Sequence, residues 1–150
     1  MKSEEVKPIN AFTVEEIVLL CYNLNGNKYE GGGLFMSRSP LIVKSKEFAL
    51  ETIRACKILR EAKCESALIN QYLRSGTSIG ANIREAFYAH GKADFIAKLH
   101  IALKECSETE YWLELLIESG YYSDKATLDK CVELKKILIA SLNTAKENLK

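Results

Sequence analysis

A set of regularly spaced basic side chains is the strongest candidate for a contact surface in this sequence. Arg54, Lys57 and Arg60 recur every third residue, so on a helix they would form one ridge over two turns. Such a ridge would hold nucleic acid through the phosphates, with an affinity that falls steeply in salt. No aromatic side chain interleaves the ridge to stack bases. The whole set, extended by two arginines of the next segment, comprises Lys44, Lys46, Arg54, Lys57, Arg60, Lys63, Arg74 and Arg84.

A second interpretation of the ridge is structural. Residues 41–63 carry six Lys/Arg against three Glu, a net charge of +3, whereas residues 92–119 carry three Lys against six acids, a net charge of −3. The ridge could therefore pair with this acidic segment, of the same or a neighbouring subunit, instead of binding nucleic acid. The sequence leaves both alternatives open.

Side-chain patterns typical of enzymes and metal proteins are missing from the sequence. His90 and His100 are ten residues apart and cannot share a metal from one helical face, and no Glu-x-x-His motif occurs. Cys106 would lie nearly opposite His100 on a helix, so no Cys-His pair is predicted. The three glycines at 31–33 are not followed by Gly-Lys-Ser/Thr, and we interpret them as a linker. We expect no enzyme activity, no cofactor and no metal.

A run of small residues between positions 75 and 82 predicts a close contact between helices. Glycine in a helix interior costs about 1 kcal/mol relative to alanine, so Gly76 and Gly80, four residues apart on one face, need a compensating contact. An exposed backbone that binds a phosphate is the alternative, disfavoured because the apolar pattern continues through the run. Asn82 and Ser78 could hydrogen-bond across this seam and fix the helix register. The predicted packing seam consists of Ser75, Gly76, Ser78, Ile79, Gly80 and Asn82.

Apolar spacing of three and four residues predicts four long helices, near residues 41–63, 66–89, 92–119 and 123–149. Pro40 precedes the first helix, where Ile53 is assigned to a widened core stripe. Gly91 and Gly120 are predicted as C-terminal caps, and Ser123 as the N-cap of the fourth helix. Because the connections are short, neighbouring helices should be antiparallel. The predicted fold class is all-α, an antiparallel up-down-up-down four-helix bundle.

The first forty residues differ from the rest of the chain. Thr13, with Glu16 three residues later, has the form of a capping box that opens a short helix over residues 13–24. The Gly-rich stretch that follows predicts a flexible linker. We expect an N-terminal extension over residues 1–40 and a bundle over residues 41–150.

The composition is that of one soluble globular domain. The chain has 150 residues, of which 47% are hydrophobic and 27% charged, and its net charge of +1 lacks the basic excess of a dedicated nucleic-acid binder. Five cysteines without a Cys-x-x-Cys pair predict buried free thiols in a reducing compartment. The N-terminus has no signal-peptide core and no segment suits a membrane span. We expect a cytoplasmic protein with no membrane partner.

The third predicted helix is apolar over a broader arc than one bundle core requires. This surplus predicts a second interface and therefore a homo-oligomer. The aromatic residues near its end, Tyr111, Trp112, Tyr121 and Tyr122, are expected to serve packing or assembly. The arc consists of Phe95, Ile96, Leu99, Leu103, Trp112, Leu113, Leu116 and Ile117.

Two stretches carry a family resemblance: LRSGTSIGANIREA, which starts at Leu73, and DFIAKLHIALKECSETEYWLELL, followed by Gly120-Tyr121. Over residues 43–142 the chain resembles the four-helix-bundle family of proteins encoded in intervening sequences of 23S ribosomal RNA genes. That family includes the accessory variability determinants of diversity-generating retroelements. The resemblance implies a ring-like homopentamer and, in the retroelement members, a basic surface that contacts nucleic acid and a reverse transcriptase. The first forty residues and the nearly neutral charge depart from the family pattern.

Two functions are compatible with these observations. The first is a non-enzymatic, homo-oligomeric accessory protein, a pentameric ring, that binds RNA or DNA through the basic set. Its partner could also be a nucleoprotein such as a reverse transcriptase. The alternative is a structural or protein-interaction bundle with no nucleic-acid role, in which the segregated charges only direct assembly.

Overall fold

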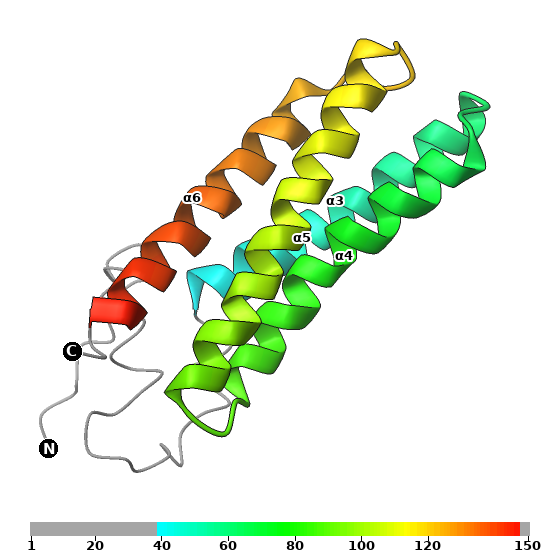
Figure 1. The fold of residues 1–150 in the computed structure, drawn as a ribbon. Coiled ribbons are helices and arrows are strands. Elements are labelled where there is room, and N and C mark those ends of the chain that lie inside the picture. The colour runs from blue at the N-terminus through cyan, green and yellow to red at the C-terminus, as the bar shows by residue number, and fades with distance from the viewer. Residues whose placement is uncertain (1–38, 148–150) are drawn as a thin grey trace, which may run out of the picture.

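A computed structural model describes residues 39–147, which form four helices in the order α3, α4, α5 and α6 (Figure 1). The four helices are Pro40–Glu61, Ser66–Phe87, Lys92–Glu118 and Lys125–Glu147. No strand occurs within residues 39–147, so the predicted all-α class is confirmed. The predicted helix over residues 13–24 and the Gly-rich linker lie outside the described residues.

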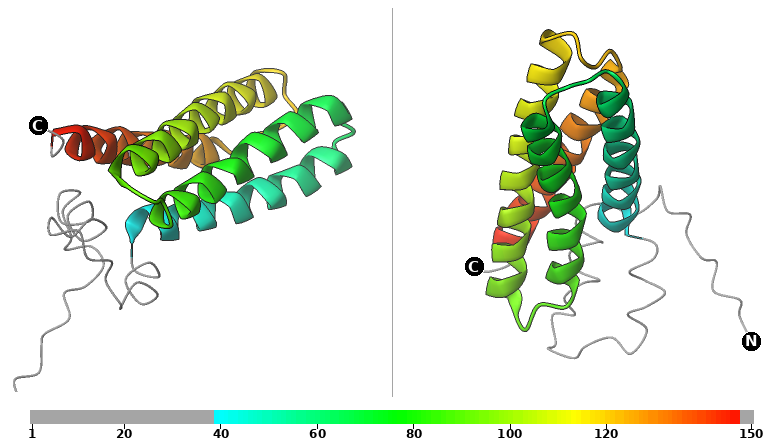
Figure 2. Two further views of the ribbon diagram at one scale, coloured as in Figure 1. Left: turned by 60° about the horizontal axis from the view of Figure 1, so that its bottom comes forward. Right: turned by 90° about the vertical axis from the view of Figure 1, so that its right-hand side faces the viewer.

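Successive helices run in opposite directions along one common axis, as the short turns at the two ends of the bundle require (Figures 1 and 2). Helix α4 packs between α3 and α5, and α5 packs between α4 and α6. Ion pairs between α3 and α6 close the bundle on its fourth side. The predicted antiparallel four-helix bundle is therefore the observed one.

Local sequence explains both ends of α3. Pro40 stands in the first turn, where its missing N–H has no helical partner to lose. At the other end, Lys63 has a φ of 54°, a left-handed conformation that glycine usually supplies. The N–H groups of Lys63 and Cys64 donate to the carbonyls of Arg60 and Leu59, which closes the helix. Helix α3 therefore ends two residues before the predicted boundary.

The two glycines predicted as C-terminal caps play different parts. Gly120 has a φ of 79° just after α5, so it is the left-handed cap that was predicted. Gly91 has a φ of −170°, which is extended backbone, and it is the N-cap residue of α5 instead. Helix α4 has already ended at Phe87, two residues before its predicted end.

Helix α6 begins two residues later than predicted. The backbone N–H of Ala126 donates to Oδ1 of Asp124 at 2.9 Å, and the hydroxyl of Thr127 donates to Oδ2 at 3.1 Å. Asp124, immediately before Lys125, is thus the capping side chain. The prediction of Ser123 as the N-cap is wrong because the carboxylate one position later satisfies the free N–H.

All four helices contribute to one apolar core, in which the exposed fraction of the central side chains is 1% or less. Because each helix buries one stripe against its two neighbours, burial of this core supplies the main stabilising free energy of the bundle. The largest fully buried side chains include Leu59 of α3, Tyr72 and Ile79 of α4, Leu99 and Leu113 of α5, and Leu138 of α6.

The cysteines of the described residues are buried free thiols, as predicted. Cys106 of α5 and Cys131 of α6 face each other with their sulfurs 3.8 Å apart. The hydrogen bond to Cys106 and burial together raise the pKa of Cys131. The thiol form is therefore favoured at neutral pH, and these residues serve as core side chains.

The two glycines of α4 lie against α3 at different distances. A Cβ atom at Gly76 would lie 2.7 Å from both Cγ2 and Oγ1 of Thr52. At Gly80 it would lie 3.4 Å from the backbone oxygen of Ser45. The first distance is too short for any carbon atom, whereas the second is close to an ordinary contact. Glycine at position 76 is what lets α3 approach α4.

The polar residues of the small-residue run bond to their own helix. Asn82 Nδ2 donates to the carbonyl of Ser78 at 2.9 Å, and the Ser78 hydroxyl donates to the carbonyl of Arg74 at 2.7 Å. The predicted hydrogen bond across the seam is therefore wrong, because serine and asparagine in a helix readily bond back to the preceding turn. Ser75 does the same within α4, and Ile79 lies in the core.

Candidate functional site

The exposed side of α3 carries four of the eight residues of the predicted basic set. Five exposed residues of this helix are spaced by four, three, four and three positions, which places them on one side of it. They are Lys46, Leu50, Ile53, Lys57 and Arg60. We use the name α3 face for seven exposed residues of this helix, among which the acids Glu47 and Glu61 are also exposed. The seven residues are Lys46, Leu50, Ile53, Arg54, Lys57, Ile58 and Arg60.

Three aliphatic side chains lie among these basic groups. Leu50 is 44% exposed, Ile53 is 42% exposed and Ile58 is 51% exposed. The prediction that Ile53 lies in the core is wrong, because the core stripe of α3 is narrower than the apolar pattern suggested. Three exposed aliphatic side chains on one helix make this side a candidate contact surface for another macromolecule.

Two members of the predicted basic set form ion pairs within the chain. Lys44 Nζ lies 2.7 Å from Oε1 of Glu133 on α6. Arg74 lies 3.3 Å from Oε2 of Glu105 and also bonds Oε1 of Glu108, both on α5. The hydrogen bond to Glu108 is the largest cause of the raised pKa of Arg74, and the same bond lowers the pKa of Glu108. These two cations therefore join neighbouring helices within the chain.

The cations of the α3 face have no ion pair among residues 39–147. The acids of α5 that form ion pairs instead bond Arg74 of α4 and, at Glu110, Lys135 of α6. Helix α5 is flanked by α4 and α6, so its acids do not reach α3. Within the described chain, the interpretation that the ridge pairs with the acidic helix of the same subunit is therefore wrong.

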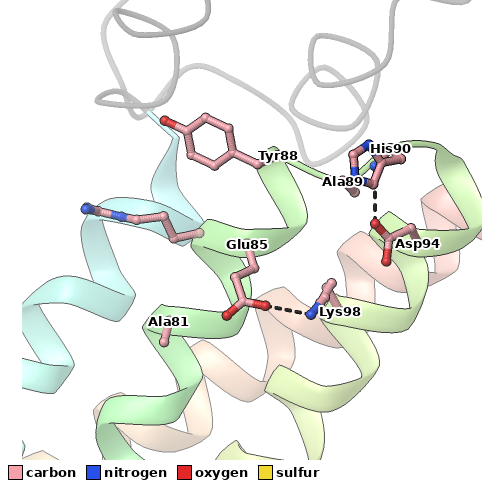
Figure 3. Close-up of a pocket in the computed structure, with 8 residues that line it drawn as sticks. Ala81, Glu85, Tyr88, Ala89, His90, Asp94 and Lys98 are labelled. Carbon is pink, nitrogen blue, oxygen red and sulfur yellow. Dashed lines mark hydrogen bonds and ion pairs between the residues drawn. The ribbon is translucent and has the colours of Figure 1, made fainter.

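Lys63 and Arg84 lie at opposite ends of the α3–α4 pair. Lys63 belongs to the turn that follows α3. Arg84 lies in the last turn of α4, where it lines an open hollow of about 710 Å³ between the ends of α4 and α5 (Figure 3). The side chains around the hollow are Ala81, Arg84, Glu85, Tyr88, Ala89, His90, Asp94 and Lys98.

The charges around this hollow are partly satisfied. Lys98 Nζ donates to Oε2 of Glu85 at 2.6 Å, and this bond is the largest cause of the raised pKa of Lys98. Oδ2 of Asp94 accepts a hydrogen bond from the backbone N–H of His90 at 3.2 Å. Arg84 has no ion pair among residues 39–147. The sequence singled out Arg84 but missed its neighbour Tyr88, which is 64% exposed.

Among the described residues, neither a metal-binding cluster nor a membrane-spanning helix is found. No group of three or more His, Cys, Asp or Glu in this part of the chain could hold a metal ion. None of the helices α3 to α6 is both long and apolar enough to cross a membrane.

The broad apolar arc of α5 packs on the protein's own core. Four of its members are buried and four are partly buried against that core. Part of the broad arc is explained by the two neighbours of α5, and the second interface stays a prediction. The exposed large apolar side chains of α5 are instead Ile101 and Tyr111, at 41% and 53% exposure.

The four aromatic residues near the α5–α6 turn take different positions. Tyr122 is buried, with its hydroxyl 3.0 Å from that of Thr127. The rings of Tyr111 and Trp112 are in contact at 5.2 Å between centroids, and Trp112 Nε1 donates to Glu108 at 3.1 Å. Only Tyr111 of this group is exposed.

Comparison with known proteins gives a family and matches among solved structures. Residues 40–140 match the family described as 23S rRNA-intervening sequence protein. A crystal structure of a protein of unknown function from the S23 ribosomal protein family of Bacteroides thetaiotaomicron is 48% identical in sequence, with a TM-score of 0.66. The match covers 68% of this chain and 97% of that one. No curated protein matches the chain.

Proposed function

This chain belongs to the family of 23S rRNA-intervening sequence proteins, and we propose that it is a non-enzymatic, homo-oligomeric accessory protein that binds nucleic acid. The binding surface is the α3 face. The nucleic acid could be bound as part of a nucleoprotein complex. The resemblance to retroelement accessory proteins suggests a reverse transcriptase as the protein of that complex.

The absence of internal partners for the α3 face carries this proposal. In residues 39–147 the cations that join helices are Lys44, Arg74, Lys98, Lys130 and Lys135. Lys46, Arg54, Lys57 and Arg60 are exposed and take no part in those pairs. Unpaired cations along one helix suit a phosphate backbone, which is itself a line of regularly spaced charges.

A ring would strengthen weak contacts without any change in the surface. One face presents few cations, but several copies on one assembly bind a polymer at a high effective concentration. Exposed apolar side chains on α5 and α6, namely Ile101, Tyr111 and Ile139, are available for contacts between subunits. We expect a homopentamer of the 16.9 kDa chain, to be measured by light scattering at micromolar concentration.

Charge reversal of the α3 face tests the proposal. A variant with Arg54→Glu, Lys57→Glu and Arg60→Glu should lose measurable affinity for RNA and DNA in mobility-shift assays. For the parent, affinity should fall about 10³-fold or more between roughly 50 and 200 mM salt if six or more phosphates are contacted across the ring. The matched control reverses Lys125, Lys136 and Lys146, which are exposed on α6.

Two results would contradict the proposal. One is a parent protein that binds neither RNA nor DNA at low salt. The other is equal loss of affinity in the two charge-reversed variants, because net charge and not the α3 face would then explain binding. Light scattering on both variants establishes that the oligomer has not dissociated.

A protein-interaction function without nucleic acid is the second candidate. The exposed Leu50, Ile53 and Ile58 favour it, because phosphates gain nothing from aliphatic neighbours whereas a protein interface does. In that case the double variant Leu50→Ser with Ile53→Ser should change the mass of the assembly. The parent and the charge-reversed variant should both show only background binding to RNA and DNA.

A further inference from the structure

Tyr88 is an aromatic side chain that the bundle holds in solvent. Its exposed fraction of 64% is the highest among the large hydrophobic side chains of the described residues. The preceding residue, Phe87, is partly buried and packs edge-to-face on Phe95, with ring centroids 6.3 Å apart. The backbone beneath Tyr88 is thus fixed by the core while its ring points away from it (Figure 3). No ring partner stacks on Tyr88 within residues 39–147.

A cation accompanies this ring. Arg84 is four residues before Tyr88, so the two side chains are neighbours on the same side of α4. Both line the hollow, and Arg84 has no ion pair among the described residues. Lys98 stands across the hollow, where its ammonium group already bonds Glu85.

The ring and cation continue the α3 face toward the end of the bundle. Gly76, Gly80, Arg84 and Tyr88 are each four residues apart, so they follow one gently turning ridge of α4. At Gly80 this ridge touches the backbone of Ser45, and Lys46 is the next residue of α3. At 1.5 Å per residue, Arg84 lies about 6 Å beyond Gly80 along α4, past Ser45 toward the N-terminal end of α3, and Tyr88, just after α4, lies about 12 Å beyond Gly80.

The carboxylate of Asp94 would repel a phosphate bound at the hollow, but it already accepts a hydrogen bond. Its carboxylate accepts a bond from the backbone N–H of His90 and lies in the first turn of α5. The positive end of the helix dipole offsets its charge at that position. Arg84 is then the cation at the hollow that has no ion pair among residues 39–147.

We infer that Tyr88 is a base-stacking platform and that, with Arg84 on a flanking phosphate, it makes the protein a binder of single-stranded nucleic acid. This inference rests on the proposed function and specifies its ligand. An exposed aromatic ring stacks on a base of any sequence, but only where the base has a free face. In a duplex each internal base is covered on both sides, so the ring adds affinity mainly for a single strand.

Fluorescence anisotropy with three probes tests the inference: a single-stranded RNA, a single-stranded DNA and the matching DNA duplex. Tyr88→Ala should weaken binding of the single strands by about 5- to 150-fold, the range for loss of one stacked base, and leave duplex affinity within about twofold. Tyr88→Phe keeps the ring and should bind as the parent does. Tyr111→Ala removes a comparably exposed ring from α5 and should have no effect. Since Tyr88 is largely exposed, all variants should fold, as a thermal melt would verify.

A cross-link gives an independent readout. A 5-iodouridine-substituted single strand, irradiated on the parent protein, should attach to the peptide that contains Tyr88.

Failure of the inference and failure of the proposed function give different results. If Tyr88→Ala binds single strands as well as the parent does, or loses single-strand and duplex affinity equally, stacking at Tyr88 is wrong while the α3 face stands. If the parent binds no nucleic acid, both are wrong. If Tyr88→Ala changes only the oligomer mass, Tyr88 belongs to a protein interface and the inference is overturned.

Discussion

Helix α3 is held on its two sides by different forces. Toward α4 it is held by shape: Gly76 leaves room only for Thr52, and the surrounding side chains are buried. Toward α6 it is held by charge: Lys44 pairs with Glu133, and Glu51 pairs with Lys130. The contact with α4 should therefore be insensitive to salt, while the contact with α6 depends on it.

The α6 side is also the less completely packed. A small hollow of about 90 Å³ opens between α3 and α6, beside Phe48 and Leu134. One oxygen of Glu51 bonds Lys130, while the other is buried without a hydrogen-bond partner among the described residues. An unsatisfied buried oxygen costs stability, so this side is the weaker attachment of the helix that carries the proposed binding face.

Adding one methyl group at Gly76 should produce the largest effect. Gly76→Ala places a carbon 2.7 Å from two atoms of Thr52, a β-branched residue whose hydroxyl also donates to Phe48 at 3.0 Å. We expect a loss of about 1–3 kcal/mol of unfolding free energy from overpacking, despite alanine's better helix propensity. Denaturant melts would measure it.

Two companion variants sharpen this result. Gly80→Ala, which meets an ordinary distance of 3.4 Å, should change stability by no more than about 1 kcal/mol in either direction. Adding Thr52→Ala to Gly76→Ala should recover part of the loss in a double-mutant cycle, because both clashing atoms are gone. Equal losses of unfolding free energy in Gly76→Ala and Gly80→Ala would show that the two positions are packed equally tightly against α3.

Neutralising the charged side should have a smaller effect. Lys44→Met with Lys130→Met removes both ion pairs to α6 and should lower Tm by no more than about a few degrees. The difference from the parent should shrink in about 1 M salt, where charges are screened within about 3 Å. Lys136→Met with Lys146→Met is the charge-matched control. A Tm loss as large as that of Gly76→Ala would show that charge fixes α3 as firmly as shape does.

The α4–α5 pair offers the smallest and most specific test. Arg74 and, to a lesser extent, Trp112 lower the pKa of Glu108 through hydrogen bonds. A lowered carboxyl pKa stabilises the fold above its ordinary value near 4.3, and this contribution is lost as pH falls through the folded pKa. Between about pH 6 and pH 3, the parent should therefore lose slightly more stability than Arg74→Gln. Identical acid profiles would show that this exposed pair contributes nothing.

The sequence predicted those features that depend on spacing within one helix. The four helices, their antiparallel order and the left-handed cap at Gly120 all have local causes in apolar periodicity, short turns and backbone sterics. Gly91 was misassigned because a glycine after a helix also precedes the next one, and only its φ distinguishes the two roles. Asp124 and Ser123 are equally good capping residues by type, so the local pattern could not choose between them.

Features that depend on the packing of two helices could not be predicted from residue spacing within one helix. Whether Ile53 is buried depends on where α4 and α6 lie around α3, and the width of the α5 stripe depends on its two neighbours. Arg84 was identified by its charge, but Tyr88 was not, because an aromatic residue at a helix end is as compatible with a core as with a surface. One available signal was the four-residue spacing of Gly76, Gly80, Arg84 and Tyr88.

The buried thiols allow the rate at which each helix separates from the bundle to be measured. Cys56 of α3, Cys106 of α5 and Cys131 of α6 are at most 1% exposed, so an alkylating reagent reaches each only when its helix separates from the others. Labelling rates, resolved by peptide mass spectrometry, would therefore report how often each helix leaves the core. If the charged side of α3 is its weaker attachment, Cys56 should label sooner than Cys106, and salt should accelerate the labelling of Cys56.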